Sequence, residues 1–200
     1  MSDEVTRASK FMAYVLRHDP GSIGLTLGDG GWVRVDKLVA AAARHGRRLD
    51  AAMIDRVLAA PGKKRYEMRD DLIRAAQGHS VAVDLGLEPR QPPSVLYHGT
   101  VARFLDSIFA DGLRPGSRTH VHLSADHETA TTVGARRGRP VVLVVDSAAM
   151  SAGGHEFFQA ANGVWLTLHV PPAFLGFPDG SPAPEPAPQP APKQAPEPTP

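Results

Sequence analysis

The stretch Pro140-Val141-Val142-Leu143-Val144-Val145 decides the fold class, because a continuous apolar run of this length is typical of a strand buried on both faces. Other strand patterns lie on either side of it, and glycine or proline interrupts them, as at Gly99 and Pro171. The further elements predicted in this half of the chain are strands over 95–98, 120–124 and 164–170, and helices over 105–112 and 128–133. The second half is therefore predicted to be mostly β.

The first half of the chain has a different pattern, which begins with a helix. Apolar residues at helical spacing continue to Leu16, and Asp19-Pro20-Gly21 stops the helix. The elements predicted after it are a turn and short strand over 30–35, helices over 37–45 and 51–59 with Asp36 and Asp50 as N-caps, and strands over 63–68 and 72–75. This order of elements is that of a winged helix, a module that often binds nucleic acid.

We therefore predict an α+β protein with four parts. A winged-helix lobe covers residues 1–86, a linker 87–94 and a β-rich lobe 95–177. Residues 178–200 are rich in proline and contain almost no apolar side chain larger than alanine, so this tail is predicted to be disordered and dispensable.

Composition excludes several classes of protein. The chain is 42% hydrophobic and 22% charged, as expected for a globular protein with a core. It contains no cysteine, which excludes disulfides, zinc–thiolate sites and a cysteine nucleophile. The N-terminus lacks the layout of a signal peptide and no apolar run approaches the roughly 20 residues that span a bilayer. We expect a soluble cytoplasmic protein without a membrane partner.

Basic side chains are the strongest chemical signal. Most of the 22 basic residues are arginine, whose planar fork pairs with phosphate at two points, although high-GC coding produces the same bias. Arg17-His18, Arg65 and Arg118 lie at the ends of predicted elements, and their convergence would make a site for a dianionic phosphate. His120 and His122 point to one face of a strand, but no third ligand has a recognisable spacing, so no metal is expected.

Seven short segments, taken together, resemble the motif series of the tRNA 2′-phosphotransferase family. They occur in that family's order over most of residues 6–175 and are the stretches at 16–20, 31–33, 65–67, 74–80, 96–100, 120–124 and 162–167. Two positions depart from the pattern: Ala76 stands where the family often has asparagine, and Gln159-Ala160-Ala161 lacks a serine.

The resemblance implies a winged-helix RNA lobe joined to an ADP-ribosyltransferase-like lobe that binds NAD⁺. It assigns catalytic roles to Arg17, His18, Arg65 and Arg118, cofactor binding to His98, Gly99, Thr100, His122 and Ser124, and we expect substrate contacts from Arg74, Gln77 and His79. Val164 falls where many ADP-ribosyltransferases have a glutamate. Trp32 and Trp165 are expected in the core rather than stacked on RNA.

The implied activity is NAD⁺-dependent removal of an internal 2′-phosphate from RNA, as in tRNA splicing and processing. An ADP-ribosylated RNA intermediate then yields 2′-hydroxyl RNA, nicotinamide and ADP-ribose 1″,2″-cyclic phosphate. The expected partner is a tRNA-like RNA with a 2′-phosphate, and the expected state is a monomer.

Two alternatives remain open at this point. One is a mono-ADP-ribosyltransferase that acts on nucleic-acid ends or protein and stops after the first step. The other is a winged-helix DNA-binding regulator, which needs a basic recognition helix, whereas residues 51–59 contain only Arg56.

Overall fold

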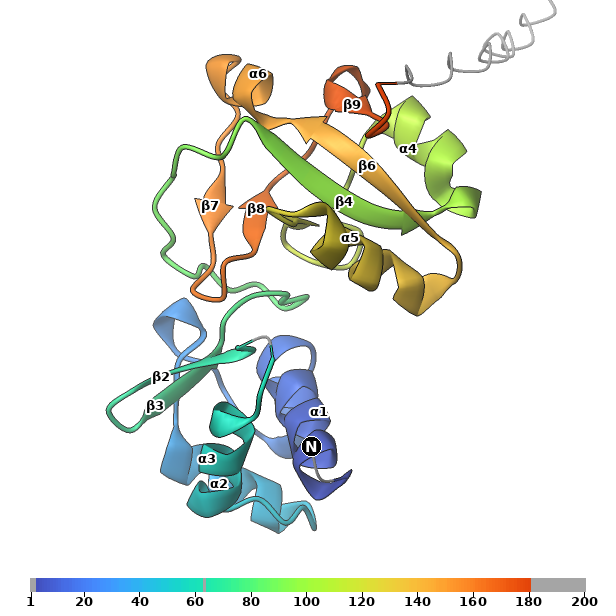
Figure 1. Cartoon of the computed structure of the whole chain (residues 1–200). Coiled ribbons are helices and arrows are strands. Elements are labelled where there is room, and N and C mark those ends of the chain that lie inside the picture. Colours follow the sequence, from blue (N-terminus) through green and yellow to red (C-terminus); the bar gives the residue numbers. More distant parts are fainter. Residues whose placement is uncertain (1–2, 63, 181–200) are drawn as a thin grey trace, which may run out of the picture.

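The computed structural model describes residues 3–62 and 64–180, whose helices and strands form two lobes (Figure 1). The elements of the first lobe are α1 (Asp3–Arg17), β1 (Val33–Arg34), α2 (Val35–Arg44), α3 (Ala51–Ala59), β2 (Tyr66–Arg69) and β3 (Leu72–Ala75). Its three strands form an antiparallel sheet in the order β1-β3-β2. A hydrophobic core drawn only from residues 5–75 holds the helices against this sheet.

The second lobe contains two small antiparallel sheets. Their strands are β4 (Val95–Val101), β6 (Pro140–Asp146) and β9 (Leu175–Gly176), in the order β4-β6-β9, and β5 (Val121–Leu123), β8 (Trp165–Thr167) and β7 (Phe158–Gln159), in the order β5-β8-β7. The helices of this lobe are α4 (Leu105–Asp111), α5 (His127–Gly134) and α6 (Ser147–Ala152). A bridge between Tyr97 and Ser124 joins the two sheets. The second core is drawn only from residues 96–175.

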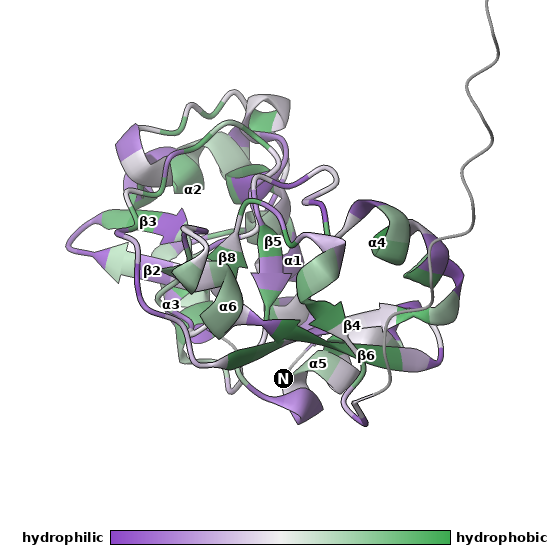
Figure 2. Ribbon diagram, turned by 90° about the horizontal axis from the view of Figure 1, so that it is seen from above, coloured by the Kyte–Doolittle hydropathy of each residue, from purple (hydrophilic) through white to green (hydrophobic). Residues whose placement is uncertain are grey.

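Short 3₁₀ helices punctuate both lobes: η1 (Pro20–Ile23), η2 (Asp29–Gly31), η3 (Ala102–Phe104), η4 (Ala135–Arg137) and η5 (Pro172–Phe174). Strand β6 is coloured as apolar along most of its length in Figure 2, as its run of valines requires. The α+β class predicted from the sequence is confirmed. The predicted tail falls mostly on residues 181–200, which lie outside the described part of the chain.

Helix α5 lies directly on strand β4 because both contribute a glycine to the contact. A Cβ built on Gly99 would lie 1.8 Å from the carbonyl oxygen of Ala130, and one on Gly134 would lie 2.8 Å from the carbonyl oxygen of Thr100. Neither neighbour is a flexible side chain, so only glycine allows the two backbones to approach this closely.

Several predicted boundaries are wrong. Asp36 does not cap α2: the helix begins at Val35, two residues before the predicted start, with Arg34 at the N-cap position. Asp36 in the first turn pairs with Arg34 at 3.1 Å. Strand β4 does not end at Gly99, because Gly99 pairs with Val142 and the strand continues to Val101.

Other elements are shorter than predicted or were not predicted. Strand β8 covers three of the seven residues predicted for it. Strand β2 begins at Tyr66, so residues 64 and 65 do not belong to it as predicted, and residue 63 lies outside the described residues. The helix α6 and the strands β7 and β9 were not predicted, because elements of two to six residues carry too little periodicity. The Asp50 cap is confirmed, since its Oδ1 accepts a hydrogen bond from the Met53 N–H at 2.7 Å.

Residues 77–80, between the two cores, make hydrogen bonds to both lobes. The Ser80 N–H donates to the carbonyl of Arg17 at 2.8 Å, and the Thr119 N–H donates to the carbonyl of His79 at 3.1 Å. The end of α1 and the loop that precedes β5 are therefore held near one another. Among the described residues, no helix is long and apolar enough to cross a membrane.

Candidate functional site

A cavity of about 150 Å³ lies where the two lobes meet, and four arginines line it. Of the described residues, those that line it include no aspartate or glutamate; they are Arg17, Arg65, Gln77, His98, Gly99, Arg118, His122, Leu123, Ser124, Val133, Arg136, Asn162 and Val164. A wall with several guanidinium groups and no carboxylate favours an anionic ligand, because charge-assisted pairs with phosphate are stronger than neutral hydrogen bonds.

The four guanidinium groups come from four separate segments. Arg17 is the last residue of α1, Arg65 directly precedes β2, Arg118 lies in the loop before β5, and Arg136 lies in η4 after α5. The Arg17 side chain also ties α1 to the β2 segment, since its Nη2 donates to the carbonyl of Arg65 at 3.1 Å. The convergence of the first three was predicted from the sequence, and the structure brings them to one cavity.

Arg17 has the least solvated of these guanidinium groups. Burial lowers its pKa, and repulsion from Arg118 and Arg65 lowers it further. Its Nε is buried and has no hydrogen-bond partner among the described residues. A buried N–H donor without an acceptor is costly, so this atom is suited to meet an anion that the cavity receives.

His18 lies next to the cavity, although it is not among the lining residues, and Ser80 fixes its ring. The Ser80 hydroxyl donates to the carbonyl of Arg17 at 3.5 Å, so its oxygen is free to accept the Nδ1–H of His18 at 2.9 Å. This arrangement leaves the lone pair of Nε2 available for a proton. Burial lowers the pKa of His18, and Arg17 and Arg118 lower it further, so the imidazole is neutral at neutral pH.

His98 and His122 are two further histidines of the site, and a hydrogen bond links them. The Nδ1–H of His98 donates to the carbonyl of His122 at 3.2 Å, and the Nε2–H of His122 donates to Oε1 of Gln77 at 2.6 Å. Burial lowers the pKa of both rings, and that of His122 falls to about 3 with a further contribution from Arg118. Both imidazoles are therefore neutral, and Gln77 links β5 of the second lobe to the first lobe.

Besides His18, three of the expected site residues are not among those that line the cavity. Arg74 donates to the carbonyls of Gly30 and Leu85 at 3.1 and 3.0 Å and pairs with Glu67 at 2.9 Å, so its guanidinium is occupied within the first lobe. Thr100 is 2% exposed and belongs to the interior of β4. His79 is 1% exposed, between the lobes. These three side chains are buried or bonded within the protein and do not reach the cavity.

The buried His79 predicts a loss of stability in acid. Both ring nitrogens lack a hydrogen-bond partner among the described residues, and burial, with Arg17 next, lowers the pKa of His79 to about 4. The unfolded chain takes up this proton near pH 6.5 and the folded chain only near pH 4, so stability falls as pH drops through this window, by up to about 3 kcal/mol.

The measurement is the melting temperature between pH 7 and pH 4 for the wild type and His79→Leu. The variant should lose less stability over this range, and a parallel decline of both proteins would contradict the prediction. His122 adds a slope in the same direction in both proteins, because its pKa is lowered as well.

Sequence reasoning did not predict Arg136 or Asn162 as site residues. Arg136 stands in an Arg-Arg pair, a pattern more typical of a solvated surface. Asn162 begins the segment 162–167, which carries part of the resemblance. Its Oδ1 accepts from the Val164 N–H at 3.3 Å, which positions the turn at the cavity wall. Val164 lines the cavity, so an apolar side chain stands at the position that the resemblance compares with a glutamate.

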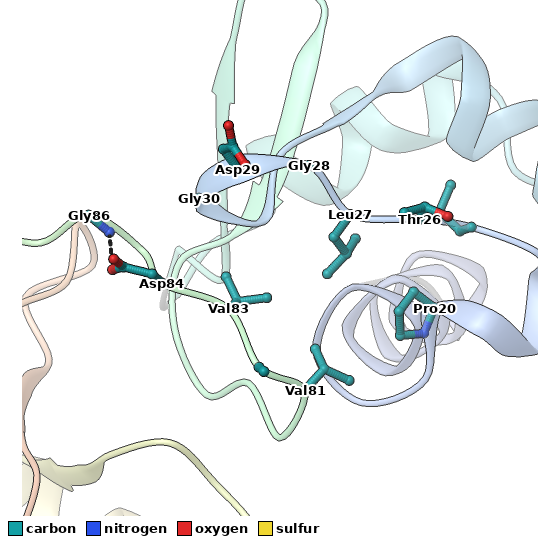
Figure 3. Close-up of a pocket in the computed structure, with 12 residues that line it drawn as sticks. Pro20, Thr26, Leu27, Gly28, Asp29, Gly30, Val81, Val83, Asp84 and Gly86 are labelled. Carbon is teal, nitrogen blue, oxygen red and sulfur yellow. Dashed lines mark hydrogen bonds between the residues drawn. The ribbon is translucent and has the colours of Figure 1, made fainter.

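A larger cavity, of about 700 Å³, lies elsewhere on the first lobe (Figure 3). It is lined by Pro20, residues 25–30 and 81–84, and Gly86. Its side chains are mostly apolar, and the carboxylate of Asp84 accepts from the Gly86 N–H at 2.8 Å. None of the site residues expected from the sequence lines it, and it carries no group that is suited to phosphate chemistry.

Comparison with known proteins agrees with the geometry of the smaller cavity. Residues 3–169 match the model of a family described as "RNA 2′-phosphotransferase, Tpt1 / KptA family". A protein of Streptomyces coelicolor named "Probable RNA 2′-phosphotransferase" is 56% identical over 176 residues, which are 88% of this chain and 97% of that protein. A protein of Agrobacterium fabrum with the same name is 54% identical over 172 residues, 85% of this chain and 92% of that protein. The chain therefore belongs to the RNA 2′-phosphotransferase, Tpt1/KptA family.

Proposed function

We propose that this chain is an NAD⁺-dependent RNA 2′-phosphotransferase. The cavity with four arginines and no carboxylate carries the proposal, because the 2′-phosphate of RNA and the diphosphate of NAD⁺ are both anionic and both substrates must be bound at the site for the reaction. A phosphate monoester carries a charge of about −1.5 to −2 at neutral pH. One such group does not balance four guanidinium groups, so the charge of the cavity favours two anionic substrates.

The residues present fit NAD⁺ as the second substrate. A volume of 150 Å³ accommodates a single ring. The neutral His98, together with Gly99 and Ser124, would hold the nicotinamide ribose, and Arg136 would meet the diphosphate. NAD⁺ supplies an anomeric carbon whose leaving group, nicotinamide, departs as a neutral molecule.

In the first step, an oxygen of the RNA 2′-phosphate forms a bond to the anomeric carbon, and the bond from this carbon to nicotinamide breaks with its electron pair. The nucleophile is already anionic, so the step requires orientation more than a base. Arg17, Arg65 and Arg118 orient the phosphate, and Val164 takes the place of a glutamate without loss of a needed group.

In the second step, the ribose 2″-hydroxyl attacks phosphorus and the bond from phosphorus to the RNA 2′-oxygen breaks. The neutral His18 accepts the hydroxyl proton at Nε2 and delivers it to the departing RNA oxygen. Negative charge grows on the phosphoryl oxygens, where Arg17 and Arg118 stabilise it. The lowered pKa of His18 therefore favours a shuttle that starts as a base.

We also infer the fold families of the two lobes. The order α1-β1-α2-α3-β2-β3 with its small antiparallel sheet supports a winged helix, and the site on β4, β5 and α5 supports an ADP-ribosyltransferase-like second lobe. A DNA-reading role finds no support in α3, since its one arginine, Arg56, pairs with Glu4 at 3.4 Å.

The test is incubation with NAD⁺ and an oligonucleotide that carries one internal 2′-phosphate. We expect stoichiometric release of nicotinamide, 2′-hydroxyl RNA and ADP-ribose 1″,2″-cyclic phosphate, and none of these without NAD⁺. A stable ADP-ribosylated product that never proceeds to cyclic phosphate would instead indicate a mono-ADP-ribosyltransferase.

Ser80→Ala should lower kcat by about five- to tenfold, the size of one net hydrogen bond, because the His18 ring loses the acceptor that fixes its tautomer. The KM values for NAD⁺ and RNA should change little, since Ser80 does not line the cavity. Steady-state kinetics and a pH profile check this, with Ser80→Thr as the control that keeps the hydroxyl. A rise in KM without a fall in kcat, or no rescue by threonine, is the contrary outcome.

A further inference from the structure

A groove of about 590 Å³ lies on the β2–β3 side of the first lobe. It is next to the cavity of 150 Å³ that Arg17, Arg65, Arg118 and Arg136 line, called the arginine cavity below. The residues that line the groove are Trp32, Lys64, Tyr66, Glu67, Met68, Arg69, Arg74, Ala76, Ala161 and Asn162. Asn162 lines the arginine cavity as well, so the two hollows meet at this residue.

The charged groups of this groove leave a surplus of positive charge. Arg74 and Glu67 pair with each other at 2.9 Å and are largely buried, so they cancel. No ion pair is found for Lys64 or Arg69 within residues 3–62 and 64–180, and both side chains are exposed. The groove therefore offers two cations for phosphate contacts, next to the four guanidinium groups of the arginine cavity.

The same groove contains a partly exposed indole and an exposed apolar side chain. Trp32 was expected in the core, and this expectation is wrong: its ring is partly exposed and lies 5.1 Å from the guanidinium carbon of Arg69 and 4.6 Å from that of Arg74. Met68 is 44% exposed beside it. An indole with a stacked arginine is a surface on which a nucleobase can stack, because every base has a π-face.

We propose that the groove of Trp32, Lys64 and Arg69 binds the single-stranded RNA that flanks the 2′-phosphorylated nucleotide. The inference rests on the proposed function. A 2′-phosphate that enters a cavity of 150 Å³ leaves the rest of its RNA outside, and the adjoining groove provides both cations and a stacking surface. Lys64 and Arg69 contact backbone phosphates, and Trp32 with Met68 contacts a base, so recognition does not depend on sequence.

The test compares two RNAs that share the same 2′-phosphate: a dinucleotide, which is too short to extend along the groove, and a decanucleotide, which is long enough to extend over it. The variant is Lys64→Ala/Arg69→Ala. Its matched control is Arg44→Ala/Arg48→Ala, which removes the same charge from exposed residues of the first lobe that do not line the groove. Binding is measured by fluorescence anisotropy from 50 to 200 mM salt, and nicotinamide release is measured for both RNAs.

For the decanucleotide, Lys64→Ala/Arg69→Ala should weaken binding by about tenfold and make the slope of log affinity against log salt shallower by about 1.4, the value for two single-strand phosphate contacts. Affinity and turnover for the dinucleotide should stay at the wild-type level, and the control pair should match the wild type with both RNAs. A Trp32→Phe variant should lose the fluorescence change on RNA binding, because the remaining Trp165 is 6% exposed.

Three outcomes would overturn the inference: equal losses for both RNAs, equal losses in the control pair, or competition by an acidic peptide as strong as that by RNA. Failure of the proposed function looks different, since the wild-type protein would then release no nicotinamide with either RNA.

Discussion

His18→Ala and Arg118→Ala should release nicotinamide but accumulate RNA that carries a 2′-phospho-ADP-ribose adduct. Proton transfer and growing negative charge on phosphorus both belong to the second step, which His18 and Arg118 serve. Loss of a positioned proton-transfer group costs about 10²–10⁴-fold in rate. A slowed second step lets the preceding intermediate build up. The measurement is a quenched time course that follows nicotinamide, adduct and cyclic phosphate separately.

The control for this experiment is Arg44→Ala, which removes an exposed arginine of α2 that does not line the arginine cavity and should leave both steps unchanged. If His18→Ala and Arg118→Ala lose nicotinamide release as severely as product formation, and no adduct appears, these residues serve the first attack or substrate binding. The division of labour between the steps would then be wrong.

Gly99→Ala should destabilise the protein by at least about 3 kcal/mol, the upper part of the range for overpacking a well-packed site. The new Cβ would lie 1.8 Å from the Ala130 carbonyl oxygen and 2.9 Å from the Gly134 nitrogen, which are backbone atoms of α5. Helix α5 must then move away from β4 and take Val133 and Arg136, which follows it in η4, away from the cavity wall. The melting temperature and NAD⁺ affinity by calorimetry should therefore fall together.

Gly21→Ala is the matched control, because its Cβ would have only an ordinary contact, 3.7 Å from Oδ1 of Asp19. It should stay within about 0.5 kcal/mol of the wild type, as most surface substitutions do. A Gly99→Ala protein that melts like the wild type but no longer binds NAD⁺ would show that this glycine serves the ligand alone and not the packing of α5.

Local patterns in the sequence were enough for the fold class and for most long elements. The apolar run of β6 and the helical spacing of α1 are signals that nearby residues carry without help from the rest of the chain. The cap at Asp50 and the glycine stop after α4 depend on hydrogen bonds within one turn, so they too were predictable. The clustering of Arg17, Arg65 and Arg118 was expected only from the resemblance to the family, because a place at the end of an element does not by itself bring distant residues together.

Tertiary contacts decided the rest, since they depend on residues distant in sequence. Gly99 looked like the end of a strand, but the Ala130 backbone packed above it requires a glycine inside β4. Arg74 was expected to contact the substrate; its guanidinium bonds to Glu67 and two backbone carbonyls, and it lines the neighbouring groove rather than the arginine cavity. Arg136 entered the site only because α5 lies flat on β4 and carries η4 to the cavity. Neighbouring residues in the chain were enough to predict most of the secondary structure. Access to the cavity depends instead on contacts between residues that are distant in sequence.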